Sequence, residues 1–299
     1  MKIHFIGIGG IGISGIACVY QQKGHQITGS DAEESEVTLQ LKEQGILVYL
    51  GHQESQVAND TDLVIYSEAV PDENPELNQA RKLGIKCLAG AEALAQLCQD
   101  YFVIAVSGMH GKSTTSSMIA QVLIEAGLDP TFIIGTKPGW RVGKSKYLII
   151  EADDYKAKFL NYHPNILVLT NIEEEHMDFF QDLEHILKVF GQYVAQVKDY
   201  IVANQDDKNI VKVIEDSNLI AKIVYYSLKD QEIEKTKEVL NVPGQHNTLN
   251  ALAALRVAQI LKIGEETTLK ALGQYKGIWR RFELKKMVIA DYEHTVVSD

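Results

Sequence analysis

Short apolar runs alternate with amphipathic segments along the N-terminal third of the chain, and glycine or acidic residues stand where one gives way to the next. The spacing of apolar positions predicts strands over 2–8, 26–31, 47–51 and 62–70, and helices over 13–24 and 37–46. Strand–helix–strand order with short connections is typical of parallel βαβ units. The N-terminal part is therefore predicted to form a Rossmann-like parallel sheet, in a chain of the α/β class.

The same alternation resumes after a predicted helix over 89–100. Apolar runs over 101–108, 146–154, 165–176 and 200–204 end in glycine, acidic or polar residues, and 247–261 has the pattern of an amphipathic helix. We place a domain boundary near residue 99, which gives domains over 1–99 and 100–283. Residues 284–299 are too few to form a further domain by themselves.

The composition indicates a soluble globular protein. Its 299 residues are 45% hydrophobic, enough for the cores of about two ordinary domains. A net charge of −11 disfavours binding to nucleic acid or to an anionic membrane surface, so an anionic ligand must be held locally. Three cysteines without a CxxC pair indicate neither a disulfide framework nor a zinc site, which fits the cytoplasm. The glycines between Gly7 and Gly15 interrupt the apolar N-terminus, unlike a signal peptide.

A glycine-rich loop, "GIGGIGISG", follows the first predicted strand. Gly7, Gly9, Gly10 and Gly12 let the backbone turn tightly and approach a pyrophosphate at the N-terminus of the next helix. Asp31 ends the second strand, where a carboxylate can accept a ribose hydroxyl. These features predict a dinucleotide or nucleotide-diphosphate ligand, and they leave an NAD-dependent oxidoreductase open.

A second loop, "VSGMHGKSTT", follows the strand predicted over 101–108. Gly108, Gly111, Lys112 and Ser113 supply backbone amides, an ammonium group and a hydroxyl, which suit a nucleoside triphosphate and its magnesium ion. The usual GxxxxGK[ST] spacing would place a glycine where Val106 stands. Despite this one departure, the loop between a strand and a helix predicts that the second domain is P-loop ATPase-like.

Two further side chains are candidates for the metal. Glu151 ends one predicted strand and His176 follows another. The carboxyl ends of parallel strands share one edge of the sheet with the phosphate loop, so both side chains can approach the nucleotide's magnesium. From spacing alone, a solvated loop position for His176 and a capping position for Glu151 stay open.

Seven segments, in order GxGGxG, "GMHGKSTT", "EADD", "TNIEEEHMD", "GQHNTLNALAA", "RRFE" and "DYEH", together resemble the Mur ligases of peptidoglycan synthesis over nearly the whole chain. The resemblance implies that the first domain binds a UDP-sugar and that the second binds ATP, through a GxxGK[ST]T variant of the phosphate loop that accommodates Val106. It also implies that residues 284–299 begin a truncated C-terminal domain.

The resemblance carries site residues onto matching positions. The UDP-sugar would be bound by Gly9, Gly10, Ile11, Gly12, Asp31 and Ser67. ATP would be bound by Gly108, His110, Gly111, Lys112, Ser113, Thr114, His246, Asn247, Asn250 and Arg280. The residues expected to take part in catalysis are Lys112, Glu151, His176 and Arg281, with Ser113, Glu151 and His176 as Mg²⁺ ligands.

The implied reaction is the ATP-dependent joining of L-alanine to the lactyl carboxylate of UDP-N-acetylmuramate through an acyl phosphate. The sequence departs from the family pattern at Gly90, where an arginine is expected, and at Lys156 and Lys158, where acidic and hydroxyl residues are expected. Three alternatives stay open beside the oxidoreductase: a binding module without turnover, a murein-tripeptide-recycling ligase, and a ligase completed by a separate chain that supplies the C-terminal domain.

Overall fold

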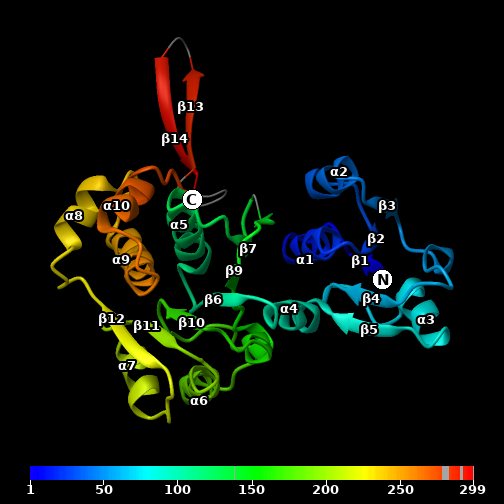
Figure 1. Cartoon of the computed structure of the whole chain (residues 1–299), viewed down its shortest axis with the longest axis horizontal. Coiled ribbons are helices and arrows are strands. Elements are labelled where there is room, and N and C mark those ends of the chain that lie inside the picture. Colours follow the sequence, from blue (N-terminus) through cyan, green and yellow to red (C-terminus); the bar gives the residue numbers. More distant parts are fainter. Residues whose placement is uncertain (138, 278–282, 290–291, 299) are drawn as a thin grey trace. The chain divides into compact units, whose positions relative to one another are not determined.

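The computed structural model describes residues 1–137, 139–277, 283–289 and 292–298, and Figure 1 traces their helices and strands. The chain divides into two compact units, the first of residues 1–100 and 138–142 and the second of residues 101–137 and 143–299. Each unit is built on its own sheet, and strands within each sheet are mainly parallel. The predicted α/β class is confirmed.

The first unit is a five-stranded parallel sheet in the order β3-β2-β1-β4-β5, with four helices. Its elements are β1 (Lys2–Ile6), α1 (Ile11–Gln22), β2 (Gln26–Asp31), α2 (Glu36–Glu43), β3 (Leu47–Leu50), β4 (Leu63–Tyr66), α3 (Pro75–Lys82), β5 (Lys86–Ala89) and α4 (Gly90–Cys98). The central strand β1 is buried at four of its five positions, as expected for a parallel strand covered on both faces.

Local capping explains where two of these helices begin. The Ser35 hydroxyl accepts from Thr38 N at the start of α2 (3.2 Å). The Asn74 side chain accepts from Glu76 N at the start of α3 (2.9 Å), where Pro75 occupies the first helical position. The sequence pattern did not predict α3 or β5.

The second sheet has seven strands in the order β12-β11-β10-β6-β9-β7-β8, and all of them except β8 belong to the second unit. The first elements after residue 100 are β6 (Phe102–Ser107), α5 (Lys112–Glu125), β7 (Thr131–Ile133), β8 (Trp140–Arg141), β9 (Tyr147–Glu151), η2 (Tyr155–Asn161) and β10 (Ile166–Leu169). They are followed by α6 (Leu183–Val194), β11 (Tyr200–Asn204), α7 (Lys208–Glu215), β12 (Lys222–Tyr226), α8 (Ile233–Val239), α9 (Gln245–Ile260) and α10 (Glu265–Gly273). A two-stranded antiparallel sheet of β13 (Glu283–Ile289) and β14 (Tyr292–Ser298) completes the described chain.

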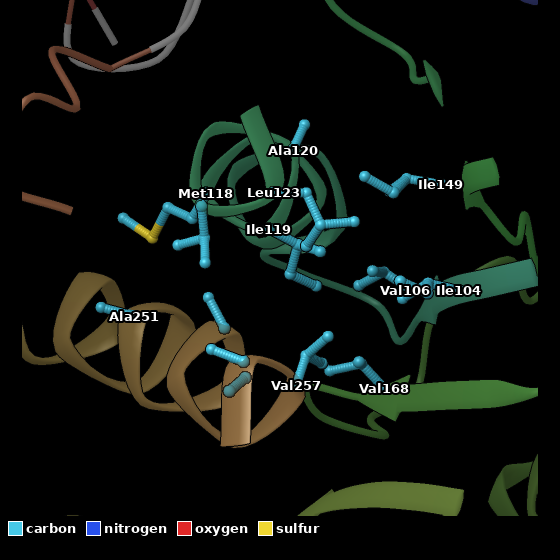
Figure 2. Packing of buried hydrophobic residues seen from close by; sticks show 14 of the residues in the cluster. Ile104, Val106, Met118, Ile119, Ala120, Leu123, Ile149, Val168, Ala251 and Val257 are labelled. Atoms are coloured by element: carbon cyan, nitrogen blue, oxygen red, sulfur yellow. The ribbon is translucent and has the colours of Figure 1, made fainter. Parts of the chain in front are cut away.

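The core of the second unit lies under the helix that follows the second glycine loop. Figure 2 shows Met118, Ile119 and Leu123 of α5 beside Val257 of α9 and Val168 of β10. Burying aliphatic side chains of this size contributes roughly 1.5–3 kcal/mol each. Helix α5 is therefore anchored by packing on strands and on a second helix.

Helix α9 differs from the amphipathic helix predicted over 247–261. It packs against α5, α8, α10, β11 and β12, so most of its surface is covered. Ten of its sixteen residues are buried, among them the polar Asn247, Thr248 and Asn250. A helix enclosed on most sides lacks the solvated face that the sequence pattern suggested.

Candidate active site

The second glycine loop connects the buried strand β6 to the first turn of α5. Gly108 has φ +132° and Gly111 has φ +82°, a region that favours glycine. A Cβ on Gly111 would lie 2.7 Å from Asn250 Oδ1, and a Cβ on Gly108 would run into Thr170 Oγ1. Both glycines are thus required by backbone conformation and by close approach, and the loop presents the free amides of a helix N-terminus.

Two polar residues after β10 hold this loop in place. Thr170 Oγ1 donates to His110 O (2.6 Å). Asn171 Oδ1 accepts from His110 N (2.9 Å), and Asn171 O accepts from Met109 N (3.2 Å). Thr170 and Asn171 were not among the predicted site residues, although both lie in the segment "TNIEEEHMD". Their position directly after a buried strand was the available signal.

Lys112 begins α5 and turns its side chain back across the loop. Its Nζ donates to Gly108 O (2.5 Å), to Met109 O (3.2 Å) and to Asp154 Oδ1 (3.0 Å). The Lys112 side chain is 17% exposed and that of Asp154 is completely buried. The ammonium group is therefore held by two carbonyl groups of the loop and by the buried Asp154 carboxylate. Asp154 was not among the predicted site residues.

His176 lies on the other side of the same carboxylate. Its Nε2 is 3.6 Å from Asp154 Oδ2, and its ring stacks at a tilt on Tyr155, with centroids 5.0 Å apart. His176 has φ +56°, an uncommon conformation for a residue other than glycine. Its carbonyl accepts from Phe179 N and Phe180 N in a local turn. The structure brings Lys112, Asp154 and His176 together through the Asp154 carboxylate.

The other two expected Mg²⁺ ligands come from the same edge of the sheet. Ser113 is buried in the first turn of α5, and Glu151 ends β9, where its Oε1 accepts from Gly135 N (2.7 Å). Within the described chain, no group of three or more His, Cys, Asp or Glu side chains could hold a metal by itself. Mg²⁺ commonly takes one or two carboxylates and completes its shell with phosphate and water oxygens, so this donor set fits the ion together with a nucleotide.

The residues of α9 expected at the adenine side have different surroundings. Asn250 lies against Gly111 of the phosphate loop. Asn247 is buried and donates to Pro243 O (2.6 Å), whereas His246 is exposed. Arg280 and Arg281 lie outside the described residues.

Lys156 and Lys158, the two departures from the family pattern, flank Tyr155. Their Nζ atoms lie 5.4 Å and 5.8 Å from the centre of the Tyr155 ring. Lys158 also donates to Asp153 Oδ2 (3.3 Å), and Tyr155 Oη donates to Asp178 Oδ2 (2.9 Å). The loop after β9 thus carries two cations on the aromatic ring that contacts His176.

The first glycine loop is shaped by contacts to the end of β2. Gly9 N donates to Asp31 Oδ2 (2.7 Å), and a Cβ on Gly9 would lie 2.8 Å from that oxygen. Gly7, with φ +74°, and Ile8 both donate to Ser30 O. At Gly12, by contrast, a Cβ would meet nothing within 4 Å. Asp31 therefore shapes the loop, and the surface around Gly12 is open to a ligand.

Gly10 and Ser67, the other residues expected to bind the UDP-sugar, also lie at the first glycine loop. Gly10 precedes the first residue of α1, Ile11, and a Cβ on Gly7 would lie 3.0 Å from Cβ of Ser67. Gly90, the third departure, begins α4, and a Cβ there would meet Glu68 Oε2 only at 3.7 Å. A Cβ at position 90 would therefore make only ordinary van der Waals contacts.

Two family descriptions match successive parts of the chain. Residues 2–102 match the Mur ligase family catalytic domain, and residues 106–258 match the Mur ligase middle domain. The chain belongs to the Mur ligase family. The UDP-N-acetylmuramate–L-alanine ligase of Clostridium perfringens is 36% identical to it over 99% of this chain and 72% of the relative. The corresponding ligase of Acetivibrio thermocellus is 39% identical over 98% of this chain and 70% of the relative.

Solved structures of Mur ligases are also similar to this chain. The UDP-N-acetylmuramate–alanine ligase of Thermotoga maritima has a TM-score of 0.85 at 26% identity and covers 100% of this Mur ligase and 74% of its own chain. The UDP-N-acetylmuramate:L-alanyl-γ-D-glutamyl-meso-diaminopimelate ligase of Neisseria meningitides has a TM-score of 0.81 at 27% identity, over 93% of this chain and 99% of its own. Among the helices of the described residues, none has the length and apolar character needed to cross a bilayer.

Proposed function

We propose that this Mur ligase joins L-alanine to the lactyl carboxylate of UDP-N-acetylmuramate with hydrolysis of ATP to ADP and phosphate. The observation that carries the proposal is the identity of 36–39% with ligases of that name over nearly the whole chain. A glycine loop at the carboxyl end of a parallel strand in each unit supports it, because the reaction requires a UDP-sugar and ATP.

The charges of the substrates determine what the protein must do. A carboxylate oxygen attacks the γ-phosphorus of ATP, the bond to ADP breaks, and an acyl phosphate results. The amine of L-alanine then attacks the acyl carbon, phosphate leaves, and the nitrogen loses a proton. Both anions must be neutralised and held in line for the first step, so positioning and electrostatics supply most of the rate.

The chain's own groups are suited to that task. The amides of the loop before α5 would bind the phosphates, and Lys112 would place its ammonium against the β- and γ-oxygens. Ser113, Glu151 and His176 would hold Mg²⁺, which supplies positive charge to the phosphate oxygens. Asp31, Gly9 and the open surface at Gly12 would receive the UDP-sugar, and we propose that the protein acts in the cytoplasm, where these substrates are made.

Phosphate release tests the proposal directly. The chain is incubated with ATP and Mg²⁺, and UDP-N-acetylmuramate and L-alanine are supplied separately and together. We expect release only when both are present, with formation of a UDP-N-acetylmuramoyl-alanine product seen by mass spectrometry. Binding of both nucleotides without release would instead identify a binding module, and an absorbance change on adding NADH and a carbonyl substrate would support the oxidoreductase.

A second candidate uses the same sugar with a different amine. The tripeptide ligase of Neisseria meningitides resembles this chain as closely in sequence identity as the alanine ligase of Thermotoga maritima. The discriminating experiment replaces L-alanine with L-alanyl-γ-D-glutamyl-meso-diaminopimelate at equal concentration. Faster phosphate release with the tripeptide would assign the chain to that reaction and exclude alanine as its main substrate.

A further inference from the structure

Asp154 is a buried carboxylate that lies between Lys112 and His176 of the proposed ATP site. It follows Glu151, the last residue of β9, by three positions, and its side chain is completely buried. Oδ1 accepts from Lys112 Nζ at 3.0 Å, and Oδ2 lies 3.6 Å from His176 Nε2. Oδ2 makes no hydrogen bond within the described chain although it is buried. Burial without a full set of partners is costly, so this carboxylate is held where a ligand or an ion can complete its environment.

The backbone around Asp154 keeps the side chain in this position. Lys156 and Ala157 both have φ of +54°, and the Asp154 carbonyl accepts from Ala157 N (2.9 Å). The chain thereby reverses immediately after Asp154. Strained residues of this kind persist only where the surrounding structure enforces them, and they cluster at functional sites.

His176 is restrained from three directions. Its backbone carbonyl closes a turn with Phe179 and Phe180, its ring packs on Tyr155, and its Nε2 faces Asp154. A carboxylate opposite one nitrogen of a metal-binding histidine orients the ring. Asp154 is therefore placed to set the orientation of the imidazole.

We propose that Asp154 is a positioning residue that competes with the nucleotide's phosphates for Lys112 and orients His176 for turnover. The proposal rests on the ATP site proposed above. In the empty site the carboxylate neutralises the ammonium group. Bound phosphates must share or take over Lys112, and they also meet a fixed negative charge. Asp154 thus weakens the binding of ATP and increases the rate at which bound ATP reacts.

These opposite effects give Asp154→Asn a signature that damage to the fold would not produce. In Asp154→Asn we expect the dissociation constant for ATP to fall by about fivefold or more. The measurement is calorimetric, with metal chelated by EDTA. Fivefold corresponds to removing the repulsion between two unit charges about 4 Å apart in water, about 1 kcal/mol, and a less polar site would give a larger change. Inorganic tripolyphosphate, which lacks the base and the ribose, should show the same change. With Mg²⁺, UDP-N-acetylmuramate and L-alanine, kcat should fall by about 10- to 100-fold while the KM for ATP does not rise.

Asp153→Asn is the matched control. It removes the same charge one residue earlier, where the carboxylate is 47% exposed and contacts Lys158 instead of Lys112. Its metal-free affinity for ATP should stay within about twofold of the original because exposed charges are well screened. Asp154→Glu keeps the charge and should keep the weaker affinity. Asp154→Ser carries the same expectations as Asp154→Asn if the asparagine variant does not fold.

Each outcome decides a separate question. ATP affinity that is unchanged or weakened in Asp154→Asn, or changed equally in Asp153→Asn, would overturn the role assigned to Asp154 and leave the ligase proposal intact. Wild-type binding of ATP without phosphate release would defeat the ligase proposal, and the metal-free binding measurements would still decide the role of Asp154.

Discussion

Replacing Glu76 should destabilise the first unit more than any exposed substitution in the same helix. Glu76 lies in the first turn of α3 and is completely buried. Its Oε2 is 2.5 Å from Nε2 of the buried His4 on β1. Its Oε1 accepts from Ser30 Oγ (2.7 Å) and lies 2.6 Å from His52 Nδ1. One carboxylate thus connects a helix, two strands and the segment after β3.

The magnitude follows from what Glu76→Ala leaves behind. The substitution removes the partner of one fully buried imidazole, one buried hydroxyl and one partly buried imidazole. Leaving a buried polar group without its hydrogen-bond partner costs roughly 1–3 kcal/mol, and the cavity adds to that cost. We expect a loss of about 4 kcal/mol. Glu76→Gln keeps the volume and one accepting carbonyl oxygen and should lose about 2 kcal/mol, because the NH2 group that replaces the other carboxylate oxygen can only donate.

Hydrogen exchange followed by mass spectrometry is the appropriate assay because a chain of two units need not unfold in one step. Peptides covering β1 and β2 report on the first unit, and those covering β6 and β10 serve as an internal reference. Glu73→Ala, an exposed glutamate just before α3, is the matched control and should change stability by less than about 0.5 kcal/mol. A loss below about 1 kcal/mol in Glu76→Ala would refute the reasoning that this network holds the unit together.

The other predictions concern both units. Lys112→Ala should abolish ATP binding but leave the affinity for the UDP-sugar unchanged in calorimetric titrations, and equal loss of both would contradict two separate sites. His176→Ala should slow phosphate release by about 10- to 100-fold and be partly rescued by added Mg²⁺; undiminished release would return His176 to an ordinary loop position. A hydrogen bond from Arg256 lowers the pKa of Glu232 from 4.5 to about 2. Because the folded-state pKa is the lower one, this pair stabilises the protein above pH 4.5 and loses that contribution as the pH falls through about 2. Denaturant unfolding of Glu232→Gln should therefore depend less on pH in that window, and an unchanged pH dependence would argue against the pair.

The positions of the two glycine loops were predictable because each follows an apolar run and precedes a helix. The sequence predicted a turn at 7–12 and a second at 108–111, and the structure has α1 beginning at Ile11 and α5 at Lys112. Helix α3 was missed because it is short and largely polar, although Asn74 and Pro75 are ordinary signals of a helix start. Short polar helices give weak periodicity, so capping residues are the better guide to them.

The residues that complete the site could not be predicted in the same way. Thr170 meets Gly108 across sixty-two positions of sequence, and that contact depends on β10 lying beside β6. Asp154 contacts Lys112 from a position forty-two residues further along the chain, just before the backbone takes positive φ values at Lys156 and Ala157. Neither feature has a periodic pattern. The ends of the apolar runs predicted candidate ligands such as Lys112 and His176, whereas the contacts that hold these side chains follow from strand order and local backbone geometry.

Both glycine loops are already engaged by a carboxylate of the chain itself. Asp31 accepts from the amide of Gly9, and Asp154 accepts from the ammonium of Lys112. In a protein with a net charge of −11, these contacts offset positive groups that would otherwise attract phosphate from a distance. Recognition of an anionic ligand must then arise from short-range hydrogen bonds formed after it enters the loop. ATP and UDP-sugar association should consequently respond weakly to salt, whereas substitutions of Asp31 and Asp154 should act mainly on the dissociation rates.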